Sequence, residues 1–132
     1  MIAFLVDLEN RPGEMAGVAE AIARAGVNIT GVAGLACGSG GRVALLTSDD
    51  AATRSALRDA QRSFQEMETT DVSMRDEPGT LARACRMLAD AGVNIEALLP
   101  TGMDGQDVRA SFVTSDPARA RQALSGMASG MR

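Results

Sequence analysis

The chain has 132 residues, of which 45% are hydrophobic and 23% charged, with a formal net charge of −4. It holds no His, Trp or Tyr and only three Phe, and its 13 basic residues are all Arg. Neither the basic surface nor the stacking aromatics of nucleic-acid-binding proteins are present. No run approaches the ~20 apolar residues of a membrane helix, and the first residues lack a basic leader. We therefore expect a cytoplasmic protein that binds neither nucleic acid nor membrane.

The residue types that are missing also restrict the catalytic and metal-binding chemistry open to the chain. Without His and Lys the chain lacks the commonest metal ligand and the Schiff-base former. Cys37 and Cys85 lie far apart and form no CxxC pair, so we expect no metal site and no cofactor. An enzyme would have to work with Asp, Glu, Ser or Cys alone, and we expect no catalytic activity.

The first half predicts strands and helices from its periodicity. Residues 2–8 form an apolar run of strand length. The Pro-Gly pair at 12–13 opens a helix with apolar residues at i, i+3, i+4 and i+7, which Gly26 ends. "VNITGVAGLA" and "RVALLTS" are expected strands around the hairpin turn "CGSGG". A helix starting at Asp49 or Asp50 and a closing strand at 64–68 complete the order βαββαβ.

The second half repeats this order. Residues 69–75 are the expected first strand and a helix starts at Gly79. Strands "VNIEALL" and "VRASFVT" follow around a turn at "GMDG", and Pro117 suits the first turn of the last helix. Few residues remain after that helix, so we expect the closing strand to be short or missing.

The repeat itself is visible in the sequence. "AGVNI" occurs at 25–29 and 91–95, each time at the same distance after a Pro-Gly pair, with an offset of 66. "TSD" occurs at 47–49 and 114–116, with an offset of 67, which predicts one extra residue in the second copy's intervening turn. We interpret the chain as two related modules in tandem.

The predicted fold class is α+β. The two modules, residues 1–68 and 69–132, are each expected to be ferredoxin-like, with an antiparallel sheet covered on one face by two helices. Modules of about 65 residues are only marginally stable alone. We therefore expect them to pack together and the chain to form a homodimer.

The "NRPGEM" loop that opens a helix, followed by "AGVNI" before the next strand, resembles the ACT domain. The pairing resembles stand-alone tandem ACT proteins, and the resemblance covers nearly the whole chain. It implies the βαββαβ fold and binding of a small amino acid at an inter-module interface. It also implies a regulatory, allosteric output through a separate partner, such as an enzyme or a transcription factor.

In ACT modules similar to those that regulate serine biosynthesis, two asparagines contact the effector. By position these resemble Asn10 and Asn28 in the first module, and Asp76 and Asn94 in the second. A histidine of those relatives is replaced by Leu8 here, which argues against serine-type specificity.

The helix amino terminus offers unpaired amides to a carboxylate, and glycine leaves the approach open. The candidate ligand-binding residues of the first module are Asn10, Gly13, Glu14, Met15, Asn28 and Ile29. Those of the second module are Asp76, Gly79, Thr80, Leu81, Asn94 and Ile95.

Structural interpretations remain open beside these. Pro-Gly is also a plain helix-start device, and Asn28 and Asn94 also suit a tight helix-to-strand connection. The whole chain is alternatively a ligand-free interaction module that pairs through its sheet edges. A third interpretation is a carboxylate-driven isomerase, which needs two acids in one pocket.

Overall fold

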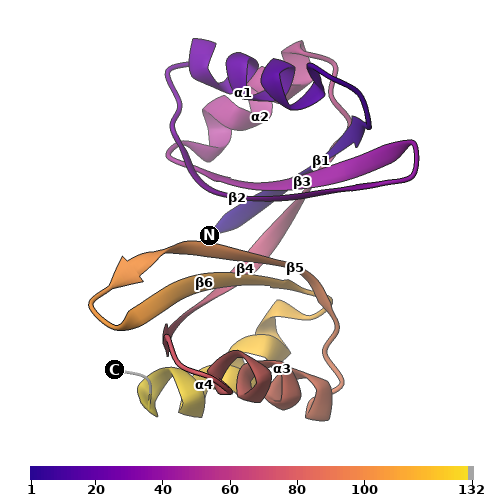
Figure 1. The fold of residues 1–132 in the computed structure, drawn as a ribbon. Helices are drawn as coiled ribbons and strands as arrows, with labels where there is room; N and C mark the ends of the chain where they lie inside the picture. Colours follow the sequence, from indigo (N-terminus) through magenta and orange to yellow (C-terminus); the bar gives the residue numbers. More distant parts are fainter. Residues whose placement is uncertain (131–132) are drawn as a thin grey trace. The chain divides into compact units, whose positions relative to one another are not determined.

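The computed structural model describes the backbone of residues 1–130 and the side chains as far as Gly126. The chain divides into two compact units. The first unit comprises Ile2–Met67, and the second comprises Met1 together with the chain from Glu68 onwards. Figure 1 shows that each unit has two helices over one face of a small sheet.

The first unit has the order βαββα followed by the start of a further strand. Its sheet has β3 between β1 and β2, antiparallel to both. Apolar alternation fixes which face each strand buries, because neighbouring residues of a strand point to opposite faces. The elements are β1 Ile2–Glu9, α1 Glu14–Arg24, β2 Ile29–Cys37, β3 Gly40–Thr47, α2 Asp50–Asp59 and β4 Phe64–Arg75.

The core of the first unit lies between the sheet and the two helices. Phe4 of β1 is fully buried, and its ring lies 6.0 Å from that of Phe64. Asp49 begins α2 as expected, since its carboxylate accepts from the amide of Ala52 at 3.0 Å. The buried residues of this cluster are Phe4, Val6, Val18, Ile22, Val27, Val43, Leu45 and Leu57.

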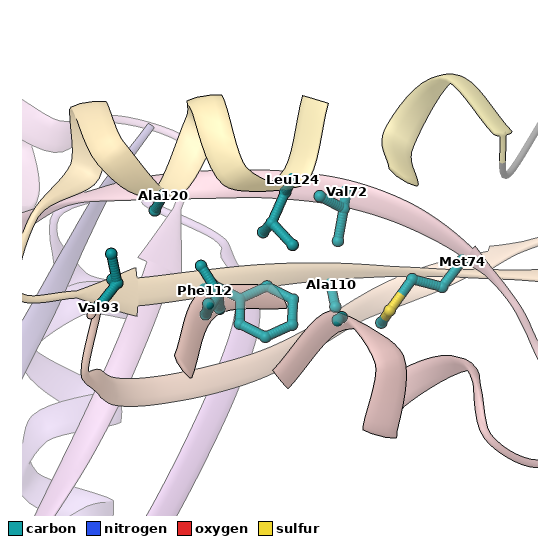
Figure 2. Packing of buried hydrophobic residues seen from close by; sticks show 9 residues of the cluster. Val72, Met74, Val93, Ala110, Phe112, Ala120 and Leu124 are labelled. Atoms are coloured by element: carbon teal, nitrogen blue, oxygen red, sulfur yellow. The ribbon is translucent and has the colours of Figure 1, made fainter. Parts of the chain in front are cut away.

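The second unit repeats the arrangement with β6 between β4 and β5, antiparallel to both. Its elements are the second part of β4, α3 Thr80–Asp90, β5 Ile95–Asp104, β6 Asp107–Thr114 and α4 Pro117–Gly130. Figure 2 shows Ala120 and Leu124 of α4 facing Phe112 of β6 and Val72 of β4. Cys85 packs against this cluster, as its place on the apolar stripe predicts. The predicted α+β class is confirmed, and the described residues form six antiparallel strands and four helices, consistent with two ferredoxin-like modules.

One strand replaces two expected ones. The sequence predicts separate strands at 64–68 and 69–75, whereas the structure has the single strand β4 over Phe64–Arg75. The segment "FQEMETTDVSMR" contains neither Gly nor Pro, so nothing in it ends an extended backbone.

The extra residue of the second repeat lies in a strand, and the expectation of a longer turn is wrong. Both hairpins have two-residue turns, at 38–39 and 105–106. The register of β5 against β6 instead shifts between Pro100 and Gly102, so Thr101 is the inserted residue of a bulge. Proline has no amide to pair and glycine adopts the φ of 150° found here, so a bulge is tolerated at this place.

The end of the chain agrees with the expected lack of a full closing strand. Within the described residues no strand follows β6, because α4 continues to Gly130. The remaining positions, 131–132, lie outside the described residues. Of the described helices, none has the length and apolar character needed to cross a membrane.

Candidate functional site

The loop between β1 and α1 is built by its glycine. Gly13 has φ 90° and ψ −11°, a left-handed conformation that side chains disfavour, and no side chain caps the helix that follows. Gly79 before α3 has nearly the same angles, φ 92° and ψ −14°, and also leaves its helix uncapped. Both Pro-Gly pairs therefore set the same sharp entry into a helix, as the sequence predicts.

Glu14, the first residue of α1, ties this loop together. Its carboxylate accepts from the main-chain amide of Glu9 at 3.0 Å and from the guanidinium of Arg62 at 3.2 Å. Arg11 lies 3.4 Å from the other carboxylate oxygen. The Glu9 amide and, after it, these two guanidinium groups hold the pKa of Glu14 below its usual value. The carboxylate is thus a fixed negative charge beside the loop.

An open groove of about 520 Å³ lies between the start of α1 and the β2–β3 hairpin. This volume is in the range of small-molecule sites. Three of the predicted residues, Asn10, Glu14 and Met15, line it. The complete lining is Leu8, Glu9, Asn10, Arg11, Glu14, Met15, Val32, Gly34, Leu35, Ala36, Gly41, Arg42 and Val43.

Asn10 connects the two walls of the groove. Its side-chain amide donates to the carbonyl of Gly38 at 3.0 Å, and its main-chain amide donates to that of Ser39 at 2.9 Å. One side-chain donor is therefore used to hold the hairpin turn beside the loop. The amide oxygen remains an acceptor at the groove's edge.

The floor of the groove is apolar and its rim is charged. Val32, which pairs with the buried Leu45, is 50% exposed on the face covered by α1, and Met15 is 36% exposed. Leu35 is 78% exposed, but it pairs with Arg42, so its side chain lies on the other face of the sheet. On the rim, Arg11 pairs with Glu9 at 3.0 Å, and both side chains are more than 60% exposed. The groove therefore combines an apolar surface with an exposed positive and an exposed negative group.

Asn28 and Ile29 lie away from the groove. Asn28 precedes β2, whereas Asn10 contacts the turn that follows β2. With nine residues in the strand, the two asparagines are separated by roughly 30 Å at about 3.3 Å per residue. Within one unit they cannot contact the same small ligand. The structure brings together Asn10, Glu14 and Met15 and leaves Asn28 at the opposite end of β2.

The backbone of Asn28 has a structural role that sequence reasoning missed. Its main-chain amide donates to the hydroxyl of Ser48 at 3.0 Å, and its carbonyl accepts from the amide of Ser48 at 2.9 Å. Asn94 and Ser115 repeat both bonds, at 3.1 and 3.0 Å. The repeated "TSD" motif was the signal for this contact, because its serine accompanies each "AGVNI".

The candidates of the second unit follow the same plan with different chemistry. Asp76 is exposed, and its amide donates to the carbonyl of Gln106 at 2.9 Å in the hairpin turn. Thr80 takes the place of Glu14 but is only 4% exposed, and Leu81 is 46% exposed. Asn94 and Ile95 again lie at the far end of the strand, at the start of β5.

Sequence reasoning also missed the hairpin wall of the groove. Arg42 of β3 lines it, but its guanidinium lies on the other face of the sheet, 2.8 Å from Asp7 and 3.4 Å from the side-chain oxygen of Gln65. Nothing in the local pattern of β2 or β3 distinguishes Val32 as a groove residue, since its exposure depends on where α1 ends its cover of the sheet. Among the described residues no group of three or more Cys, Asp and Glu is placed to hold a metal ion.

Residues 69–122 match the ACT domain family. No curated protein sequence matches the chain. A crystal structure of a protein from Bacteroides thetaiotaomicron superposes with a TM-score of 0.81 at 21% identity, covering 96% of this chain and 87% of that one. The ligand-free regulatory subunit of aspartate kinase from Thermus thermophilus gives 0.64 at 19%, covering 95% and 89%. Aspartate kinase from Synechocystis gives 0.62 at 22%, covering 97% and 26%.

These likenesses establish the fold over nearly the whole chain. The ACT identification is confirmed for residues 69–122. The assignment of the first half to the same family stays a prediction, as does the tandem arrangement of modules 1–68 and 69–132.

Proposed function

We propose that the protein is a regulatory tandem ACT protein that binds a small amino acid or related metabolite and signals to a separate partner, without catalysing a reaction. The observation that carries this is the groove beside the first Pro-Gly loop, which combines an apolar floor with paired opposite charges. The ACT domain at 69–122 and the fold shared with a regulatory subunit of aspartate kinase support a regulatory role.

An amino acid suits the groove because it carries both charges next to a variable side chain. Its carboxylate would bind the guanidinium of Arg11 and the uncapped amides at the start of α1. Its ammonium would bind the carboxylate of Glu9 and the amide oxygen of Asn10. The Arg11–Glu9 pair is exposed, and an exposed pair contributes only about 0–1 kcal/mol, so a ligand separates it at little cost. The side chain would lie against Met15 and Val32.

A second copy of the chain would complete the site. β2 is an edge strand of its sheet, with an unpaired row of backbone groups. If two β2 strands pair antiparallel, the end of one lies beside the start of the other, which places Asn10 of one copy near Asn28 of the next. We therefore propose a homodimer with the ligand between copies, and a ligand that strengthens the dimer would change the affinity for a regulated enzyme or transcription factor.

The test is thermal unfolding with each of the twenty amino acids at millimolar concentration. A ligand at 100 times its Kd should stabilise the native state by about 2.7 kcal/mol. We expect a shift with one amino acid or a few related ones, which Asn10→Ala and Asn28→Ala both remove. Asn94→Ala is the matched control and should keep it. If no amino acid shifts the transition and none changes the sedimentation coefficient, the proposal is wrong.

The exposed edge of the first unit favours one other function, a ligand-free module that pairs with a partner protein. β2 is an edge strand with Val32, 50% exposed, on one face and Leu35, 78% exposed, on the other, and such an edge suits strand addition. This function predicts unchanged unfolding with every amino acid. It also predicts loss of a hetero-complex in Leu35→Lys, whereas ligand-dependent dimerisation of the wild type would exclude it.

A further inference from the structure

The two units differ at the three strand positions that leave the groove open. In the first unit these are Gly34 and Ala36 of β2 and Gly41 of β3, all with a small side chain or none. Because these three residues have small side chains or none, no side chain from them covers the floor of the groove next to the start of α1.

Gly34 is not required by the fold. A Cβ atom built there would meet its nearest neighbour, a methyl group of Val43, at 3.5 Å, which is ordinary van der Waals contact. Gly41 differs, because a Cβ atom there would lie 2.8 Å from the carbonyl oxygen of Leu35. Packing thus explains Gly41, while at Gly34 an ordinary strand residue would fit and would only fill the groove.

The second unit has larger side chains at all three matching positions. Gly34 pairs with Val43 in the first unit, and Pro100 pairs with Ala110 in the second. The facing pair Ala36 and Gly41 corresponds in the same way to Met103 and Val108.

Val108 stands where the first unit has Gly41. It pairs with Met74 as Gly41 pairs with Leu8, and it packs against the buried cluster of the second unit. The bulge between Pro100 and Gly102 lies in the part of β5 that corresponds to Leu35, the residue whose carbonyl a side chain at position 41 would contact.

The rim also differs. Thr80 stands where the first unit has Glu14, and Glu77 stands where it has Arg11, so neither the fixed carboxylate nor the exposed guanidinium is kept. Arg109 matches Arg42 but lies over Gly102, where a Cβ atom would come within 2.6 Å of its guanidinium. The second unit therefore lacks the charged rim of the groove and carries larger side chains at its floor positions.

We infer that each chain binds one ligand, in the first unit only, and that Gly34 is the residue that sets the size of ligand admitted. In the second unit the larger Pro100, Met103 and Val108 stand at the positions that leave the groove open in the first. This inference rests on the proposed function and adds to it the stoichiometry, the competent unit and a specificity-determining residue.

The test is isothermal titration of the full-length chain with each of the twenty amino acids. We expect one ligand per chain for any that binds. Gly34→Val should weaken binding at least tenfold or shift preference toward glycine and alanine, with no loss of thermal stability, because valine suits a strand and its Cβ fits. Asp76→Asn in the second unit is the matched control and should bind like the wild type.

Two ligands per chain, an effect of Asp76→Asn as large as that of Gly34→Val, or unchanged binding by a folded Gly34→Val would overturn the inference and leave the proposed function standing. If Gly34→Val does not fold, the affinity of Gly34→Ala and the number of ligands bound per wild-type chain test the inference instead. Absence of binding by every amino acid would overturn both the inference and the proposed function.

Discussion

Replacing Thr114 by valine tests a buried hydroxyl that the second unit leaves unpaired. Thr114 is 1% exposed, and its hydroxyl has no hydrogen-bond partner in the described part of the chain. The matching Thr47 of the first unit lies 2.7 Å from the hydroxyl of Thr53, which itself donates to the carbonyl of Asp49 at 2.7 Å. Six residues after Thr114 the chain has Ala120, which offers no hydroxyl.

The expected effect of Thr114→Val is stabilising. A buried polar group without a partner costs about 1–3 kcal/mol, and valine keeps the branched shape of threonine. We therefore expect the free energy of unfolding to rise by about 1–2 kcal/mol. Ala120→Thr, which supplies a partner, should raise it by about 0.5–1.5 kcal/mol, the usual net value of one hydrogen bond.

Urea denaturation followed by circular dichroism measures these changes. The matched control is Thr47→Val in the first unit, which removes a satisfied hydroxyl and should lower the free energy of unfolding by about 1 kcal/mol. The reasoning is refuted if Thr114→Val destabilises the protein as much as Thr47→Val does, since the hydroxyl of Thr114 would then have a partner.

Two further outcomes follow from the Pro-Gly loops. The pKa of Glu14 is lowered in the folded protein, so its carboxylate stabilises the fold above the unfolded value of about 4.3, and that contribution is lost as pH falls through the folded-state pKa. Glu14→Gln should therefore lower the free energy of unfolding most above pH 5 and progressively less in acid, and a difference independent of pH would contradict this. Gly13→Ala should cost about 1–2 kcal/mol through its left-handed backbone alone, because a Cβ atom there meets nothing within 4 Å. Gly79→Ala should cost the same in urea denaturation, and stability unchanged in both would show that the loop relaxes freely.

The fold was largely predictable because its signals are local. Three kinds of signal each depend only on neighbouring residues: helix starts at Pro-Gly and at Asp49, helix ends at glycine, and strand segments of alternating polarity. The structure has these features where they are expected. Boundaries between strands were less predictable. Whether "FQEMETTDVSMR" forms one strand or two depends on the strands that pair with it. The one extra residue of the second repeat is equally compatible with a longer turn and with the bulge found at Thr101, because both change the offset by one.

The candidate site was predictable only along one loop. The Pro-Gly pair pointed to Asn10, Glu14 and Met15, which do line the groove. Asn28 was chosen from the same repeat, yet its distance from Asn10 follows from the length of β2 and the turn at its end. No spacing in the sequence states which end of a strand faces which loop.

By itself the sequence determined the repeated order of elements, the uncapped helix starts and the absence of histidine and lysine chemistry. These follow from backbone preferences and side-chain inventories, which act over a few residues. Only the tertiary structure decided that Val32 and Leu35 stay exposed, and that the carboxylate of Glu14 accepts from the amide of Glu9 and the guanidinium of Arg62. It also decided that Gly34 lines the groove. Such features arise from the approach of segments far apart in the chain, and an approach of this kind is fixed by packing rather than by local pattern.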